Sequence, residues 1–151
     1  MAARWIALGV LCVLGCSTAP QPGPVIELSQ LMEWVIDPAA DVVWDSVKTI
    51  ATEEGTKEIA PRTQEEWDAV RNAAAVLAEA GSSLMSEGRA RDHDRWMKAA
   101  RRLIDAAQGA LAAAQAKDAG ALFAAGGRIY DACAACHRQY APQLNAHAGT
   151  R

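Results

Sequence analysis

The C-terminal part of the chain carries an apolar stripe that strongly limits how the chain can fold. Its members follow one another at steps of 4, 3, 4, 3 and 4 residues: Leu122, Gly126, Ile129, Cys133, Cys136 and Tyr140. Such steps place side chains on one face of an α-helix, which buries that face against other helices. The stripe therefore predicts a helix that begins at the cap Asp118 and ends before Pro142, with both cysteines facing the interior or its edge.

The preceding part of the chain also has the character of helix, because alanine is abundant and runs of β-branched or aromatic residues are few. A first helix is expected over about 25–52. Pro38 falls inside it and is expected to kink or split it, with Asp37 as a candidate cap. No strand pattern is apparent.

Two further helices are expected between these. One begins at Thr63, where Glu66 completes a capping box, and stops at Gly81. Its predicted buried stripe is Trp67, Val70, Ala74 and Leu77. The other starts near Asp92 or Asp94 and runs to about residue 116, with Trp96, Leu103, Ala107 and Leu111 buried. Four amphipathic helices with short connections predict an all-α fold, an antiparallel up-down-up-down four-helix bundle.

The first residues have the pattern of an export signal. Arg4 precedes an apolar run that is too short to span a bilayer. The run ends in Val-Leu-Gly-Cys16, which resembles a bacterial lipobox and makes Cys16 the lipidated first residue of the mature protein. The alternative is an ordinary secretory signal cleaved near Ala19. Either pattern predicts an exported protein, and the lipobox predicts a periplasmic lipoprotein held at a membrane by its lipid.

These patterns divide the chain into parts. Residues 1–15 are the expected signal peptide, 16–24 a lipid anchor and flexible tether rich in Pro and Gly, 25–141 the folded domain, and 142–151 a mobile tail. The formal net charge of −3 argues against nucleic acid as a partner. Proteins and small molecules stay open as partners.

The motif Cys133-Ala-Ala-Cys136-His137 carries the chemistry. Two thiols one helical turn apart can reach the two vinyl groups at one edge of a porphyrin, and the adjoining imidazole can bind the iron. Cys-x-x-Cys-His is the attachment signal of c-type haem, and an exported chain suits it. The motif predicts one covalent haem c per chain, bound through Cys133 and Cys136, with His137 as the proximal iron ligand.

Other uses of the two cysteines stay open. A thioredoxin-like pair would need a βαβ context and a helix N-terminus that lowers the thiol pKa, whereas this pair lies near the end of a helix. A zinc site would use the motif together with His147, but the adjacent Cys136 and His137 rarely both bind one tetrahedral ion. A structural disulfide is the remaining alternative.

A haem motif on the last helix of a four-helix bundle resembles the cytochrome c-prime family and its low-spin, methionine-ligated relatives. The resemblance covers roughly residues 27–140 and rests on the motif, the nearby Tyr140 and the order of the helices. It implies a periplasmic haem protein, in many members a homodimer, that carries electrons or binds NO and CO. In the family, the first helix faces the distal side of the haem.

The resemblance implies where the second iron ligand would come from. The start of the first helix, Leu31-Met32, looks like the same region of the methionine-ligated relatives, so Met32 is the candidate distal ligand. Pro38 departs from the family pattern, and Trp44 is the alternative occupant of the distal face. A core position is the ordinary use of such a methionine. Weaker candidates are Met85 and Met97 for the iron, Tyr130 for packing on haem, and Arg128 and Arg138 for the haem propionates, while His93 is expected to be solvated.

The sequence thus predicts an electron carrier that passes one electron to redox partner proteins. The alternative is a gas-binding haem protein in which the distal face of His137 is open. A zinc or disulfide module is the third hypothesis. Nothing in the sequence calls for catalysis, because neither a nucleophile–base arrangement nor a phosphate loop is apparent.

Overall fold

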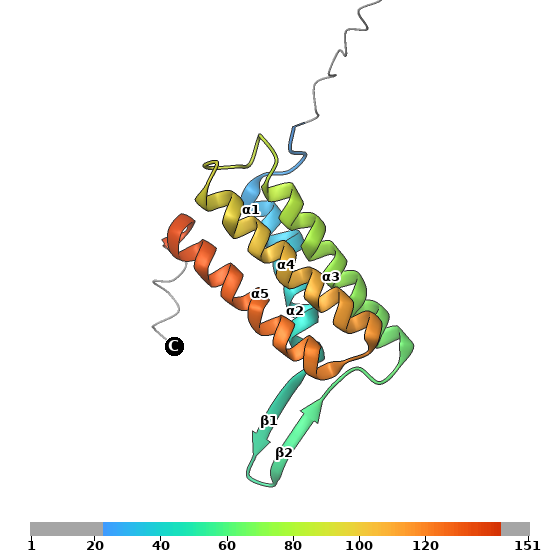
Figure 1. Cartoon of the computed structure of the whole chain (residues 1–151). Helices are drawn as coiled ribbons and strands as arrows, with labels where there is room; N and C mark the ends of the chain where they lie inside the picture. The colour runs from blue at the N-terminus through green and yellow to red at the C-terminus, as the bar shows by residue number, and fades with distance from the viewer. Residues whose placement is uncertain (1–22, 143–151) are drawn as a thin grey trace, which may run out of the picture.

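The computed structural model describes residues 23–142, which are mostly helical (Figure 1). In chain order the elements are α1 (Leu28–Leu31), the π-helical turn η1 (Met32–Ile36), α2 (Asp37–Ser46), β1 (Lys48–Thr52), β2 (Gly55–Ile59), α3 (Gln64–Leu84), α4 (Arg95–Ala116) and α5 (Ala119–Tyr140). The predicted mainly helical fold is confirmed. Within these residues, none of the helices combines the length and the apolarity needed to cross a membrane.

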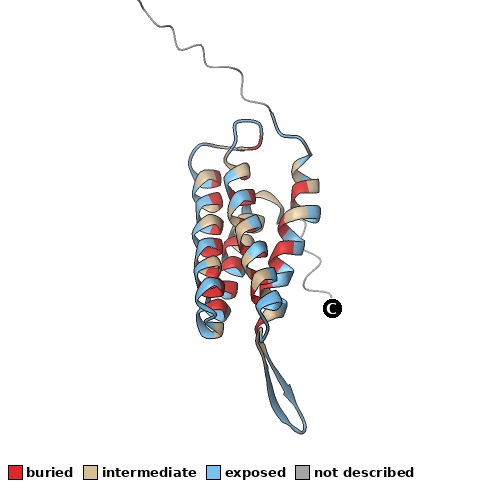
Figure 2. Ribbon diagram, turned by 90° about the vertical axis from the view of Figure 1, so that its right-hand side faces the viewer, coloured by how far each residue is buried: buried red, intermediate tan, exposed pale blue. Residues whose placement is uncertain are grey.

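The helices pack through one face each. α4 lies between α3 and α5, and α2 contacts both α3 and α5 from the other side (Figure 1). Figure 2 shows buried residues on the facing sides of the ribbons. The largest fully buried side chains are Val43, Val70, Leu77, Leu122 and Ile129. Alanines such as Ala107 and Ala110 are fully buried on α4, where small side chains let neighbouring helices approach closely.

The predicted buried stripes are confirmed with one exception. Trp67, Val70, Ala74 and Leu77 are buried on α3, as are Trp96, Leu103 and Ala107 on α4. Leu111 is half-buried. The periodicity of apolar residues therefore identifies the inward faces of α3 and α4 correctly.

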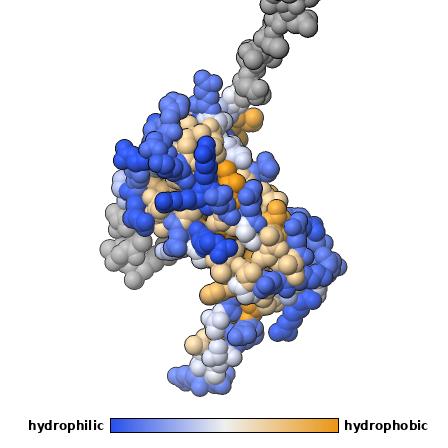
Figure 3. Space-filling view, in the orientation of Figure 1, coloured by the Kyte–Doolittle hydropathy of each residue, from blue (hydrophilic) through white to orange (hydrophobic). Residues whose placement is uncertain are grey.

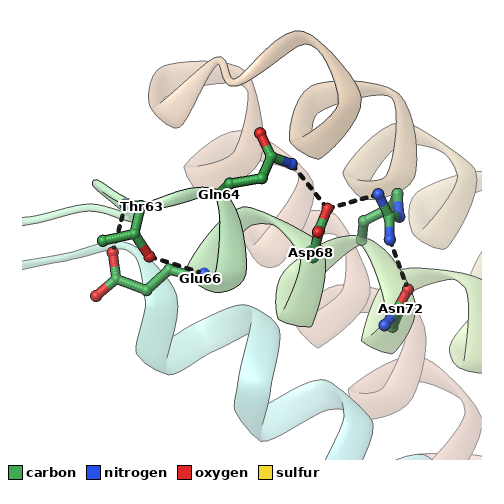
Figure 4. A network of polar contacts seen from close by, with 6 residues as sticks. Thr63, Gln64, Glu66, Asp68 and Asn72 are labelled. Atoms are coloured by element: carbon green, nitrogen blue, oxygen red, sulfur yellow. Dashed lines mark hydrogen bonds and ion pairs between the residues drawn. The ribbon is translucent and has the colours of Figure 1, made fainter.

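Local capping fixes the starts of α3 and α5 as predicted. The hydroxyl of Thr63 accepts from the Glu66 N–H at 3.2 Å, and the Glu66 carboxylate accepts from the Thr63 N–H at 3.0 Å (Figure 4). At α5, the Asp118 carboxylate accepts from the Ala121 N–H at 2.9 Å. Lys117, with φ of 56°, makes the tight turn between α4 and α5.

The predicted end of the second helix at Gly81 is wrong, because α3 continues to Leu84. Gly81 is buried, and a Cβ there would lie 2.7 Å from Cγ1 of Ile104 on α4. The missing side chain therefore serves close packing of two helices, and the glycine does not terminate the helix.

The first helix is shorter than predicted and is followed by a hairpin that the sequence reading missed. The helix ends at Ser46, and Val47 is already extended. β1 and β2 pair antiparallel, with Lys48 opposite Ile59, and Gly55 follows the turn with φ of 136°. β-branched residues favour strand over helix, and glycine tolerates the turn geometry. The hairpin projects from the body and is largely exposed and polar (Figures 2 and 3).

The predicted break at Pro38 takes another form. Ile36 and Asp37 keep helical backbone angles, so Asp37 is not a cap, and the prediction that it caps is wrong. The irregularity is the π turn η1, immediately before the proline. Because Pro38 has no N–H, it cannot complete the regular hydrogen-bond ladder, and the wider turn precedes it. The turn changes which side chains face α5.

Candidate functional site

The stripe of α5 passes from the core to the edge of the molecule along its length. Its first members, Leu122, Gly126 and Ile129, are buried, whereas Cys133, Cys136 and Tyr140 are half-buried. His137, next to the second cysteine, is half-buried too. Both cysteines are free thiols. The motif is thus held on a regular helix with its side chains at the boundary between core and solvent.

A small cavity of about 30 Å³ lies between the motif and the elements opposite it. Met32, Ile36 and Asp37 line it from η1 and α2, and Cys133, Cys136 and His137 line it from α5. The ends of α3 and α4 contribute apolar residues: Leu84, Ala99, Ala100 and Leu103. The cavity is therefore apolar apart from one carboxylate and one imidazole.

A larger cavity of about 760 Å³ adjoins the same residues. Met32, Asp37, Cys136 and His137 line both cavities. The larger one is also lined by the apolar or aromatic residues Leu28, Trp96 and Tyr140, by the acids Glu27 and Glu33, and by Arg91. A space of this size suits a cofactor. Among the described residues, its lining also includes the polar side chains of Ser29 and Gln139, so aromatic and apolar walls stand beside acids and one arginine.

The π turn explains why Met32 and Asp37 face the same cavities. The Asp37 N–H donates to the carbonyl of Met32, five residues earlier, so the two residues are stacked on one side of the helix. Both side chains are brought toward α5 in this way. The structure therefore brings Met32 together with Cys136 and His137, which a regular helix through Pro38 would not guarantee.

The environment of the thiols opposes their ionisation. Burial raises the pKa of Cys133 to about 11, and the nearby Asp37 and Cys136 add to the rise. Burial also raises the pKa of Cys136. A thioredoxin-like pair needs the opposite, a lowered thiol pKa. The two thiols are therefore neutral at pH 7 and unlike those of a dithiol oxidoreductase.

Asp37 is an acidic residue that lines both cavities together with Cys136 and His137. Burial raises the pKa of this carboxyl, while the nearby His137 acts to lower it, and Asp41 and Glu33 act to raise it. Because the Asp37 side chain is exposed, solvent screens part of its interaction with the imidazole. Asp37 thus interacts electrostatically with the Cys133 thiol and with the His137 imidazole.

The rim of the larger cavity is fixed by a contact between α5 and the start of α4. The Tyr140 hydroxyl donates to the Asp92 carboxylate, which also accepts from the N–H groups of Asp94 and Trp96. The Trp96 and Tyr140 rings meet edge to face with centroids 4.9 Å apart. Accepting these bonds lowers the pKa of Asp92 to about 2, while burial and the Asp92 contact raise that of Tyr140 to about 12. α4 thus begins directly after Asp94, one of the two predicted starting points, and the Asp92 carboxylate accepts from the Trp96 N–H in its first turn.

Other residues singled out from the sequence lie elsewhere. Trp44 donates to the Gly126 carbonyl at 3.0 Å and packs edge to face on Tyr130, two turns before the motif. It lines neither cavity, so the alternative that it occupies the face opposite His137 is not what the structure shows. Met85, Met97, His93, Arg128 and Arg138 also line neither cavity, and His93 and Arg138 are exposed.

The charged residues Glu27, Glu33, Asp37 and Arg91 line the site, although the sequence does not identify them as functional. For Asp37 it predicts only a helix cap, and for Arg91 it predicts no role. Pro38 was the available signal for Asp37, because it marks an irregular turn that changes which residues face inward. The position of Arg91 follows from how the loop between α3 and α4 folds over the site, which no local pattern reports.

Part of the predicted machinery lies outside residues 23–142: the signal peptide 1–15, the lipidation site Cys16, most of the tether, His147 and the tail. Within the described range, no group of three or more His, Cys, Asp or Glu side chains is arranged to hold a metal ion. No protein-family model, curated protein or solved structure matches the chain.

Proposed function

We propose that the protein is a c-type cytochrome that binds one covalent haem and transfers single electrons. The observation that carries the proposal is the position of Cys136 and His137 beside Met32 on the walls of one cavity of about 760 Å³. The motif would supply two thioether links and one iron ligand, and Met32, which lines the same cavity, would supply the second ligand. Bound haem would supply the one-electron chemistry.

The residues present suit that cofactor. Neutral thiols suit thioether formation, in which each S–H adds across a vinyl double bond without a change of oxidation state. Leu28, Trp96 and Tyr140 provide apolar and aromatic walls, and Arg91 provides a cation for a propionate. This assignment moves the propionate partner from Arg128 and Arg138, which line neither cavity, to Arg91.

His137 and Met32 come from separate elements that both pack into the core, so neither ligand depends on a loop. Leu31, next to Met32, and Ile36, four residues after it, are buried, and so is Ala132, next to Cys133. Ligands fixed by a packed scaffold move little when the iron changes oxidation state, and small reorganisation favours electron transfer. We infer from this that the molecule works as a carrier and that a gas-binding role would need Met32 to leave the iron.

The finer fold and the location belong to the same proposal. The first helical stretch, α3, α4 and α5 would form the up-down-up-down bundle of the cytochrome c-prime family, extended by the β1–β2 hairpin. Export, lipidation of Cys16 and a periplasmic position at a membrane are supported by the N-terminal sequence pattern. Redox proteins would be its partners, and a homodimer is the form that the resemblance favours.

Visible spectra of the oxidised and reduced protein test the function. The full chain would be produced together with the cytochrome c maturation machinery. We expect a low-spin, six-coordinate spectrum in both states that does not change on addition of CO. A high-spin ferrous spectrum that changes with CO would contradict the electron-carrier proposal and support the gas-binding alternative.

A further inference from the structure

We propose that Asp37 is a positioning residue that holds the His137 imidazole in its iron-binding orientation and lowers the reduction potential of the haem. The proposal rests on the function proposed above. It concerns a residue whose sequence context, directly before Pro38, indicates only a helix cap.

The small cavity shows that these two groups belong together. Within the described part of the chain, its lining is apolar or sulfur-containing except for Asp37 and His137. His137 is half-buried and Asp37 is exposed, so the carboxylate lies at the boundary between this apolar space and solvent. An imidazole that binds iron through one ring nitrogen carries its N–H on the other nitrogen, and in metal sites that N–H regularly donates to a carboxylate or a carbonyl. Asp37 is the carboxylate available here.

The elements packed around His137 offer few competitors. α3 and α4 present Leu84, Ala99, Ala100 and Leu103 to the small cavity. α5 itself presents the two cysteines, Gln139 and Tyr140, whose hydroxyl is engaged by Asp92, and Ser29 of α1 lines the larger cavity as a further neutral polar residue. Arg91, a cation, and the acids Glu27 and Glu33 line the larger cavity and not the small one. Among the acids of residues 23–142, Asp37 alone lines both cavities.

The electrostatic consequence has a definite sign. A carboxylate beside the iron ligand stabilises the more positive, oxidised iron and gives the bound imidazole more anionic character. Both effects lower the reduction potential. The π turn η1 brings this carboxylate to the site. Pro38 and the turn before it would therefore influence the reduction potential of the haem through the position of Asp37.

The test uses the holoprotein and three substitutions. Asp37→Asn removes the charge and keeps the size, and Asp37→Glu keeps the charge. Asp41→Asn is the matched control, because it removes the same charge one turn further along α2, where Asp41 lines a separate hollow beside α3. The midpoint potential is measured by spectroelectrochemistry. The NMR shifts of the haem methyl groups in the oxidised state report the orientation of the imidazole.

We expect Asp37→Asn to raise the midpoint potential and to change the pattern of haem methyl shifts. Asp37→Glu should stay closer to the wild type than Asp37→Asn in both measurements. Asp41→Asn should leave the methyl shifts unchanged and move the potential less. A holoprotein in which Asp37→Asn and Asp41→Asn behave alike would overturn the role of Asp37. A chain that takes up no covalent haem would instead overturn the proposed function itself, and this inference with it.

Discussion

Met32 lines the same two cavities as His137, although a methionine in an apolar stripe is ordinarily a core residue. Its side chain is half-buried and packs against the edge of the hydrophobic core. The π turn brings it toward α5 together with Asp37. At the scale of single residues, this placement favours the proposal of an electron carrier, because a Met32 ligand would leave the iron no free coordination position for a gas.

Replacing Met32 by alanine is expected to remove the second iron ligand. The ferrous holoprotein should then become high-spin and bind CO, because a methyl side chain cannot reach the iron. Visible spectra with and without CO measure the change. Met97→Ala is the matched control, since Met97 is a half-buried methionine of α4 that lines neither cavity. Spectra of Met32→Ala identical to those of the wild type would rule out Met32 as a ligand.

The contact between Tyr140 and Asp92 predicts a pH dependence of stability. Asp92 has a lowered pKa of about 2, so its contribution is complete above its ordinary pKa of 3.8 and is lost as the pH falls toward 2. Tyr140 has a raised pKa of about 12, so its contribution is complete below its ordinary pKa of 10 and is lost as the pH rises toward 12. The contact should stabilise the fold most between about pH 4 and pH 10.

Tyr140→Phe tests that window, because phenylalanine keeps the ring against Trp96 and removes only the hydroxyl. The free energy of unfolding of both proteins is measured by denaturant titration across the pH range. We expect the difference between them to be largest in the middle and to shrink toward both extremes. A difference that stays constant with pH would show that the hydroxyl contributes nothing through Asp92.

At the scale of whole elements, α3 and α4 depend on a close approach at Gly81. A valine there would have to displace Ile104, because even a Cβ would lie 2.7 Å from its Cγ1 atom. Overpacking of this kind costs about 1–3 kcal/mol, which exceeds the small gain in helix propensity. Gly81→Val should therefore lower the free energy of unfolding, as measured by denaturant titration.

Gly127 provides the comparison for that substitution. It lies on α5, and no atom is within 4 Å of where its Cβ would be. Gly127→Ala should raise the free energy of unfolding by about 0.5–1 kcal/mol, because alanine favours helix without a clash. If both glycine substitutions stabilised the protein, the close packing at Gly81 would not limit the approach of α3 and α4.

The elements that the sequence predicts well are those with local causes. The Thr63–Glu66 box and the Asp118 cap involve residues three positions apart, so the chain specifies them by itself. Gly81 was misjudged because its role depends on Ile104, which is distant in sequence. The hairpin over 48–59 was missed because its β-branched residues follow a helix without a break. The motif on α5 was predictable, whereas the roles of Asp37 and Arg91 depend on tertiary packing.

At the scale of the whole molecule, the candidate site and the hairpin lie at opposite ends (Figure 1). The chain enters near the site, since Pro24 packs on Gly88 in the loop between α3 and α4, and Glu27 and Leu28 line the larger cavity. In the proposed lipoprotein, the haem would therefore lie at the end of the molecule nearest the anchor. Such an arrangement favours exchange of electrons with a partner at the membrane surface.

The central claim is that Cys133 and Cys136 bind haem covalently, and the mass of the denatured protein tests it most directly. The full chain would be produced with the cytochrome c maturation machinery and unfolded. Its mass would then be measured by mass spectrometry after reversed-phase chromatography. We expect one haem to stay attached to the polypeptide, and to be absent after Cys133→Ser and Cys136→Ser are introduced together. A wild-type chain that emerges at the mass of the polypeptide alone, or that releases its haem on unfolding, would contradict the account.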